Sequence, residues 1–392
     1  MNGLINKKVC IISTVHNALD VRIFFKEAKS LHKAGYQISL IAKHPTSTVV
    51  DGIEIIGLRD MQSRIRRMII LPIQAFSIAI REKALLYHLH DPELIFVGLL
   101  LKILTRSVVI YDAHEDFPST VFARDWIPDW LKPILSKLVN SFELTISSKF
   151  DAIITADPAV AQRFSEVHQE VTILYNVPPR KLVTTPPKAM RERTRSLVHI
   201  GSVSRSRGIW FLLEVIGELF RMEIDFQLDF YVNNTSWGMM MDFADQIANE
   251  GLSSYVNINK ALPYPELLQE LRHFRVGLIP FLDMEKYHKN IATKMFDYMA
   301  SGLAIVASDL PPQRAVIETA GCGKLIEPED PAAFACAIRD LLAAPERAFE
   351  MGERGWSVIQ SQYCWEVEEE KLINLYDSLL QGGKQGLYSN GR

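Results

Sequence analysis

A lysine and an aspartate stand three residues apart, at Lys294 and Asp297, where the sequence predicts a helix from about Ile291. Together with Thr293, they fall in its first two turns. The amino end of a helix carries partial positive charge and favours an anion. Lys294 can neutralise a phosphate there, while the Asp297 carboxylate can accept hydrogen bonds from a ribose diol. The alternative is an exposed i to i+3 salt bridge, worth only about 0.3 kcal/mol.

A second candidate anion site follows an expected strand, LVHI (197–200), which leads into Gly201. The next seven residues, SVSRSRG, begin at Ser202 and include serines that let backbone N–H groups approach an anion. Arg205 and Arg207 add positive charge to this loop. The spacing matches neither the P-loop pattern nor G-x-G-x-x-G. We interpret the loop as a phosphate cradle, with a basic surface turn as the alternative.

Two histidines, His88 and His90, stand at strand spacing and therefore share one face of an expected strand. Such a pair is more often structural than part of a ligand set. No D-x-D motif stands at an expected strand end. The sequence therefore predicts no metal site.

The scaffold for these residues is predicted by alternating apolar periodicities. Short apolar strands are expected at 8–14, 37–43, 86–90, 107–114 and 151–155, and again at 226–232, 255–259, 275–279, 303–308 and 323–327, with helical segments between them. This alternation is typical of an α/β fold with parallel sheets covered on both faces. Ligands of such sheets bind at the carboxyl ends of the strands, where the candidate residues lie.

Composition narrows the class of protein. The chain has 392 residues, of which 48% are hydrophobic, enough for two domains with separate cores. Its net charge of −3 argues against a nucleic-acid-binding protein, which would be strongly basic. The four cysteines have no paired short spacing and no signal peptide is evident, so we expect a reduced, cytoplasmic protein. The most apolar stretch, 68–80, is shorter than the roughly 18 residues of a membrane-spanning helix.

Several ordered segments resemble one known family. They are TKMFDYMASGLAIVASD (293–309) with GKLIEPED (323–330), VHIGSVSRSRG (198–208), LHDPELIFVG (89–98), VVIYDAHEDFP (108–118), LYNVP (174–178) and HNALDVRIFFKEAKSLHKAGYQISLI (16–41). Together they resemble the retaining glycosyltransferases of family 4, also called group 1. The resemblance implies the GT-B fold, an α/β architecture of two facing Rossmann-like domains, with a final helix that returns to the N-terminal domain.

The resemblance also implies a division of the chain. Residues 1–178 would form the acceptor-binding domain, and the proline- and arginine-rich segment 179–195 the linker. Residues 196–362 would bind the nucleotide-sugar, 363–380 would form the returning helix, and 381–392 a flexible tail.

The family's functional residues map onto the segments quoted above. Arg207 and Lys294 would stabilise the departing diphosphate, and His114 would hydrogen-bond the sugar or shuttle the acceptor proton. No metal or cofactor would be needed. The remaining donor contacts would come from Gly201, Ser202, Arg205, Thr293 and Asp297.

Three positions depart from the family pattern. Lys289 stands where an acidic residue is usual, Ser202 where an arginine is usual, and Thr293 where a proline is common. Glu285 is a candidate for the missing acid, and Arg205 for the missing cation.

A possible membrane contact lies in the N-terminal half. A basic cluster directly precedes an apolar stretch there, and it consists of Arg59, Arg64, Arg66 and Arg67. This composition suits an anionic membrane surface. A helix with a basic exposed face and an apolar buried face is the alternative. Trp126 and Trp130 form a second candidate contact.

The resulting hypothesis is transfer of a sugar from a nucleotide diphosphate sugar to a glycan or polyprenyl-linked acceptor, with retention, in surface polysaccharide biosynthesis at the inner face of the membrane. Two alternatives stay open. A non-hydrolysing sugar-nucleotide epimerase would release free sugar-nucleotide product. A non-catalytic partner subunit, which the Lys289 and Ser202 departures favour, would not turn over the donor.

Overall fold

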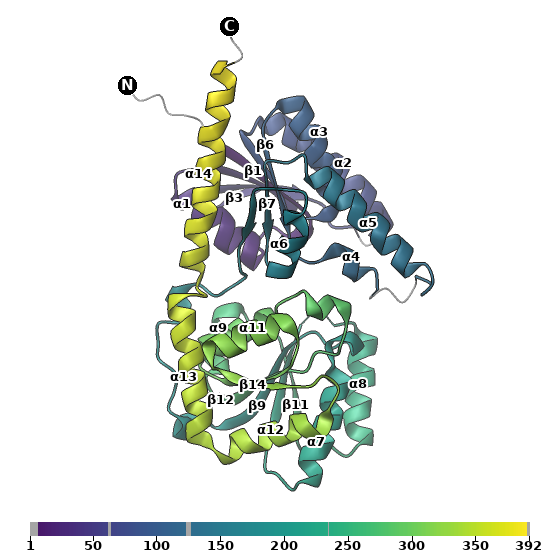
Figure 1. Ribbon diagram of the computed structural model, residues 1–392, viewed down its shortest axis with the longest axis vertical. Helices are drawn as coiled ribbons and strands as arrows, with labels where there is room; N and C mark the ends of the chain where they lie inside the picture. Colours follow the sequence, from purple (N-terminus) through teal and green to yellow (C-terminus); the bar gives the residue numbers. More distant parts are fainter. Residues whose placement is uncertain (1–6, 62–63, 123–126, 234, 390–392) are drawn as a thin grey trace. The chain divides into compact units, whose positions relative to one another are not determined.

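The computed structural model describes residues 7–61, 64–122, 127–233 and 235–389. The chain divides into two compact units, which Figure 1 shows as separate α/β assemblies. Unit 1 consists of Met1–Asn176 and Trp365–Arg392, and unit 2 consists of Val177–Cys364.

Unit 1 is built on one sheet with the strand order β3-β4-β2-β1-β5-β6-β7-β8 among the described residues. The pairs are parallel except for β3 with β4. Its strands are β1 (Lys8–Asn17), β2 (Gln37–Lys43), β3 (Thr48–Val50), β4 (Ile53–Leu58), β5 (Leu86–Leu89), β6 (Val108–Ala113), β7 (Ala152–Thr155) and β8 (Val171–Ile173).

Helices cover both faces of this sheet. Alternate residues of β1 enter different cores: Val9 and Ile11 join one, while Cys10 and Ile12 join the other. The strand is therefore apolar throughout, as expected for a parallel sheet buried on both faces. The helical elements are η1 (Val21–Ala28, a π-helix), α1 (Lys29–Lys33), α2 (Arg64–Glu82), η2 (Pro92–Leu94), α3 (Ile95–Thr105), α4 (Phe117–Thr120), α5 (Lys132–Ser147), α6 (Pro158–Ser165) and α14 (Trp365–Ser389).

The last helix, α14, belongs to the core of unit 1. Trp365 and Tyr376 are buried in the same cluster as Val9 and Ile11. The Trp365 indole donates a hydrogen bond to Ser30 Oγ (2.9 Å), and the Tyr376 hydroxyl lies 2.7 Å from His88 Nδ1. Because α14 extends to Ser389, it includes most of the segment 381–392 that was assigned to a tail.

Unit 2 contains one parallel sheet with the strand order β11-β10-β9-β12-β13-β14 in the described part of the chain. Its strands are β9 (Arg195–Gly201), β10 (Leu228–Val232), β11 (Val256–Lys260), β12 (Phe274–Ile279), β13 (Ala304–Ser308) and β14 (Gly323–Ile326). Its helical elements are η3 (Arg180–Leu182), η4 (Met190–Glu192), η5 (Arg205–Arg207), α7 (Ile209–Arg221), α8 (Trp237–Asn249), α9 (Tyr264–Leu271), η6 (Glu285–His288), α10 (Thr293–Ala300), α11 (Pro311–Ala320), α12 (Pro331–Ala343) and α13 (Pro345–Ser361).

The segment 179–195, predicted as a linker, packs onto unit 2. Arg193 is 1% exposed, and its guanidinium donates to the carbonyl oxygens of Phe274 (2.7 Å) and Lys188 (3.0 Å). The Trp356 indole donates to the Val183 carbonyl at 3.0 Å. Contacts with β12 and α13 therefore satisfy polar groups of this segment, which belongs to unit 2.

The predicted α/β class with parallel sheets is confirmed, and each expected strand coincides with an observed one. The short strands β3, β4 and β8 were not predicted, and α10 begins at Thr293 rather than near Ile291. Of the helices within the described residues, none combines the length and apolar character needed to cross a bilayer.

Candidate functional site

The loop after β9 is held in place by two glycines with positive φ. Gly201 ends β9 at φ +130°, and Gly208 precedes α7 at φ +72°. A Cβ atom on Gly208 would lie 1.6 Å from the carbonyl oxygen of Pro280. Only glycine fits that position, so the loop is held against the end of β12.

Two cationic side chains meet at the start of this loop. A Cβ atom placed on Gly201 would lie 3.3 Å from Lys294 Nζ and 3.7 Å from Arg207 Nη1. Arg207 comes from η5 and Lys294 from the first turn of α10. The structure therefore brings together the two residues that the sequence assigned to a diphosphate.

Lys294 is buried, with 6% of its surface exposed. Its Nζ lies 3.1 Å from Nε2 of the buried His199 on β9. Burial, reinforced by the nearby Arg207 cation, holds the pKa of Lys294 well below its ordinary value. Burial and Lys294 likewise hold the pKa of His199 well below 6.5, so that imidazole is neutral.

Asp297 lies one turn further along α10 and has a different partner. The hydroxyl of Tyr264, at the start of α9, donates a hydrogen bond to Asp297 Oδ1 at 2.7 Å. Burial and the Asp297 charge raise the pKa of Tyr264 well above 10, so it remains a donor. Lys294 and Asp297 thus contact different side chains, His199 and Tyr264, in place of the exposed i to i+3 salt bridge between them. Thr293, the first residue of α10, is exposed.

The other predicted donor contacts are more exposed. Ser202 Oγ donates to Asn233 Oδ1 at 3.2 Å. The guanidinium of Arg205 lies over the ring of Trp210, 4.6 Å from its centroid. In the loop before α10, Lys289 forms an ion pair with Glu285 at 2.9 Å. Arg205 and Glu285 were the two candidates for the missing family residues. In the structure Arg205 contacts Trp210 and Glu285 contacts Lys289.

In unit 1, His114 follows β6 at the edge of a buried cluster. Its Nε2 lies 2.9 Å from Nδ1 of His90 and 3.8 Å from Asp112 Oδ2. Burial lowers the pKa of His114, Asp112 opposes this change, and Arg22 adds to it. His114 is 20% exposed and so retains access to solvent.

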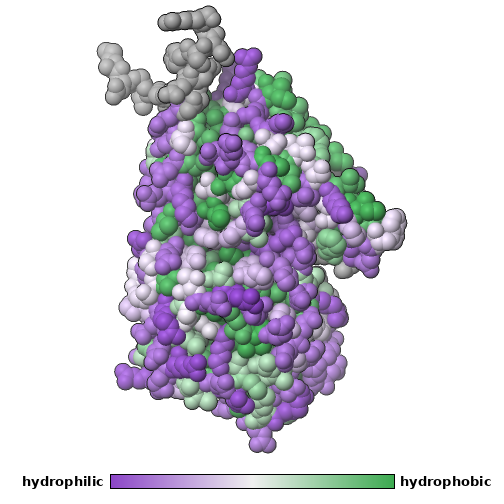
Figure 2. Space-filling view, viewed as in Figure 1, coloured by the Kyte–Doolittle hydropathy of each residue, from purple (hydrophilic) through white to green (hydrophobic). Residues whose placement is uncertain are grey.

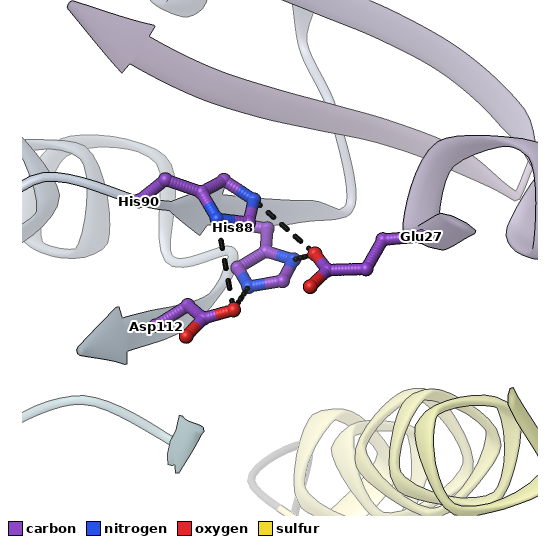
Figure 3. A group of neighbouring side chains, drawn as sticks. All are labelled: Glu27, His88, His90 and Asp112. Atoms are coloured by element: carbon purple, nitrogen blue, oxygen red, sulfur yellow. Dashed lines mark ion pairs between the residues drawn. The ribbon is translucent and has the colours of Figure 1, made fainter. Parts of the chain in front are cut away.

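Behind His114 lie four fully buried side chains, which Figure 3 shows converging from η1, β5 with the residue after it, and β6. Each offers one potential metal ligand, and these atoms lie within 4.8 Å of one another. The His90–Glu27 distance is 3.4 Å, and the His90–Asp112 distance is 3.6 Å. The four residues are Glu27, His88, His90 and Asp112.

The charge balance of this cluster favours a proton over a metal ion. Arg22 lies 2.9 Å from Glu27 Oε1 and 2.8 Å from Asp112 Oδ2. A divalent cation would leave these three charged side chains with a net charge of +1, whereas one proton makes them neutral. Burial, assisted by Asp112 and opposed by Arg22, raises the pKa of Glu27. This direction favours the protonated form of Glu27 over that of Asp112, whose pKa is lowered by Arg22 against the effect of burial.

Reasoning from the sequence missed four of these partners: Arg22, Glu27, His199 and Tyr264. Each meets its partner through a contact between elements distant in sequence, which local periodicity does not reveal. One signal was present, because Arg22, Lys26 and Glu27 are charged residues that alternate with apolar ones in the segment RIFFKEA.

Two family models match the chain. "Glycosyltransferase Family 4" matches residues 21–177, and "Glycosyl transferases group 1" matches residues 194–344. The chain belongs to the family 4, group 1 glycosyltransferases. The predicted family is thus confirmed.

Curated relatives of this glycosyltransferase are distant. A D-inositol 3-phosphate glycosyltransferase 1 of Catenulispora acidiphila is 22% identical over 264 residues, which cover 61% of each chain. A D-inositol 3-phosphate glycosyltransferase of Corynebacterium jeikeium is 23% identical over 198 residues, which cover 50% of this chain and 46% of that protein. The matched regions thus span less than two thirds of the relatives' length.

Solved structures match nearly the whole chain. Sucrose-phosphate synthase from Thermosynechococcus elongatus has a TM-score of 0.78 at 16% identity, covering 96% of this chain and all of that one. Anabaena HepE in complex with UDP and glucose has a TM-score of 0.74 at 12% identity, covering 95% and 100%. The glycosyltransferase therefore has the GT-B fold, built from two parallel-sheet α/β domains.

Proposed function

We propose that this glycosyltransferase transfers a sugar, with retention of anomeric configuration, from a nucleotide diphosphate sugar to a glycan or polyprenyl-linked acceptor in surface polysaccharide biosynthesis. The main support is the meeting of Lys294 and Arg207 at Gly201, where the buried lysine nitrogen has a neutral bonded partner. The charged form of a buried lysine is costly without a bonded anion, and a diphosphate would supply that anion. HepE, which has the same fold, is described in complex with UDP and glucose.

The roles of the cations follow from the charge changes of the reaction. As the bond between the anomeric carbon and the diphosphate breaks, its electron pair moves to the departing phosphate oxygen. Lys294 and Arg207 would stabilise that developing charge from fixed positions, which is where an enzyme gains most. Asp297, held by Tyr264, would accept hydrogen bonds from the ribose. We expect a clamp of protein cations, without a metal ion.

His114 is the proposed group on the acceptor side. Its lowered pKa keeps it neutral near pH 7, so it can accept a hydrogen bond or the acceptor proton. Contact with His90 restrains its ring at the edge of the cluster.

We further propose that unit 1 contacts an anionic membrane surface, and the exposed side chains favour a broader patch than the predicted arginine cluster. Arg59 and Arg66 are exposed, whereas Arg67 pairs with Glu93 at 3.6 Å. Arg64 begins α2, but its side chain lies outside the described part, and so does Trp126. Trp130 is 74% exposed.

Helices α3 and α5 present an apolar ridge to solvent, visible in Figure 2. We define the apolar ridge as Phe96, Leu100, Ile103, Leu104, Ile134, Leu138 and Phe142, which are 42–63% exposed. Beside it lies a pocket of about 400 Å³ lined mainly by apolar residues, including Ile95 and Phe117. An exposed apolar patch of this extent is typical of an interaction site.

The charges around the apolar ridge suit anionic lipid. The acids on α2, α3 and α5 are Glu82 and Glu143; Glu82 pairs with Lys8 at 2.8 Å, and Glu143 is buried. The same helices carry seven basic residues, namely Arg64, Arg66, Arg67, Arg81, Lys102, Lys132 and Lys137. Three of the seven form ion pairs with acids outside these helices: Arg67 with Glu93, Lys102 with Asp151 and Lys132 with Asp129.

A donor screen tests the proposed activity. The purified protein is incubated with a panel of UDP-, GDP- and ADP-sugars, and nucleotide release and the configuration of any product are measured. We expect slow hydrolysis of one donor, with the α or β configuration of the donor kept on transfer. An epimerised sugar-nucleotide would support the first alternative. Binding without any turnover, even with lipid-linked acceptors, would support the non-catalytic subunit.

A further inference from the structure

The surroundings of Lys294 are unusual for a lysine at pH 7. Its bonded partner within the described residues is Nε2 of His199 at 3.1 Å. The other ring nitrogen, Nδ1, lies 3.1 Å from the Leu278 carbonyl oxygen. Since that oxygen can only accept, Nδ1 carries the proton and Nε2 accepts from Lys294. A neutral imidazole orients the lysine but supplies no negative charge.

The titratable groups around Lys294 come from three elements. Arg207 on η5 approaches the same point above Gly201 and adds positive charge. On α10 itself, Asp297 is one turn away and accepts a hydrogen bond from Tyr264. On β9, His199 is neutral. Burial and Arg207 therefore disfavour the charged form of Lys294, and Asp297 only partly opposes them.

We propose that Lys294 is an uncharged amine while the site is empty and takes up one proton when a diphosphate binds. The proton comes from solvent and converts the amine to an ammonium ion. Arg207 attracts the anion from the start, since a guanidinium does not lose its proton in proteins. This inference rests on the proposed function, because the ligand is the diphosphate of the donor.

The inference gives donor binding a defined dependence on pH. The complex holds one proton more than the free protein, so affinity must fall as pH rises between the pKa of Lys294 in the empty site and its pKa in the complex. At the steepest point the loss approaches about tenfold per pH unit. A site with permanently charged cations would show no such slope.

Calorimetry can count the proton directly. UDP, ADP and GDP are titrated into the full-length protein at pH 8.5 in two buffers with different ionisation enthalpies. A terminal phosphate with a pKa near about 6 is already ionised at this pH, so uptake reports on the protein. We expect wild-type uptake approaching one proton per nucleotide.

Two substitutions of Lys294 separate the effect of a positive charge on binding from the effect of its protonation. Lys294→Arg keeps a cation that does not titrate, so binding should continue with no proton uptake and a flat pH profile. Lys294→Met should show no uptake and weaker binding. For the positioning role of His199, His199→Gln should keep wild-type affinity, because an amide oxygen can replace Nε2, whereas His199→Leu should weaken it.

The outcomes distinguish a failure of the protonation inference from a failure of the proposed function. Tight nucleotide binding by the wild type with no proton uptake overturns this inference and leaves the proposed function standing. Proton uptake that persists in Lys294→Met assigns the proton to another group and also overturns it. Absence of binding by any nucleoside diphosphate overturns the proposed donor class, and this inference with it.

Discussion

At the scale of single residues, Lys294 and Asp297 stand close together in the sequence of α10 but contact different neighbours. Lys294 is held by His199 on β9, and Asp297 by Tyr264 on α9. Each contact crosses between elements, so it is fixed by the fold of unit 2. This separation allows the two side chains to serve different parts of one ligand.

Replacing Asp297 tests the proposed diol contact. Asp297→Ala should weaken nucleotide binding measured by calorimetry, because the acceptor is lost, while Asp297→Glu should keep much of the affinity. Tyr264→Phe is the matched control. It removes the partner hydroxyl, with an expected loss of about 1 kcal/mol in the free energy of unfolding, but it keeps the carboxylate. Unchanged affinity in Asp297→Ala would contradict the assignment.

Replacing the cations tests the leaving-group clamp. Arg207→Ala and Lys294→Ala should lower kcat by about two to three orders of magnitude, the scale found for a single stabilising group. Their effect on the donor KM should be smaller, since the charges act mainly on the departing phosphate. Steady-state kinetics on the identified donor checks this. Arg221→Ala is the control, because its exposed guanidinium on α7 pairs with Glu218. Equal losses in all three variants would argue against a specific clamp.

At the scale of elements, the π-helix η1 brings charge into the core of unit 1. It carries Arg22 and Glu27, both buried, to the ends of β5 and β6. A π-helix widens the backbone turn and is often found at functional sites. The buried histidines next to it are neutral, and burial lowers the pKa of His88 to about 4.

The low pKa of His88 makes unit 1 sensitive to acid. Between pH 6.5 and about 4 the unfolded chain binds a proton at His88 that the folded chain does not, so stability falls as pH falls. This contribution is on the order of 3 kcal/mol. Urea unfolding at several pH values should therefore show a smaller acid loss in His88→Gln than in the wild type. Glu27 titrates in the opposite sense, so only the difference isolates His88.

The control for this experiment is His32→Gln, which changes an exposed histidine of the same unit. Its stability should follow the wild type at each pH. Parallel curves for His88→Gln and the wild type would contradict the prediction.

The elements show how far the sequence was informative. Apolar periodicity located the strands β1, β2, β5 and β9, and the glycines and arginines after β9 marked the loop that η5 occupies. These features depend on local chemistry. The π-helix and the His199 contact were not predicted, because they depend on which distant strands become neighbours. The contact between Arg193 of segment 179–195 and the Phe274 carbonyl oxygen on β12 was not predicted for the same reason.

At the scale of the whole molecule, the exposed apolar surface is distributed unevenly. All seven members of the apolar ridge lie in unit 1, on α3 and α5. The apolar stretch 68–80, which suggested membrane contact in the sequence, forms part of α2, where Leu71 and Ala75 are buried. The structure therefore moves the proposed contact from one helix to a broader face.

Vesicle sedimentation tests this contact. The wild type should bind anionic vesicles at low salt and release them as salt rises, because surface charges are screened. The double variant Ile103→Glu with Leu138→Glu should lose binding, as apolar insertion is blocked by charge. Phe220→Glu, which changes a similarly exposed apolar residue of unit 2, is the control. A wild type that ignores anionic vesicles, or a double variant that binds normally, would contradict the proposal.

The packing of α14 also constrains the order in which the chain can fold during synthesis. Translation releases unit 2 as one continuous segment, Val177–Cys364, whereas the first unit requires Trp365 and Tyr376 to complete the core around Val9 and Ile11. The strands of unit 1 are therefore synthesised before unit 2 but can pack against α14 only after unit 2 has been synthesised. Until α14 has been synthesised, the apolar face of the sheet that α14 covers is exposed and accessible to chaperones. Unit 1 therefore begins to be synthesised before unit 2 but completes its core after it.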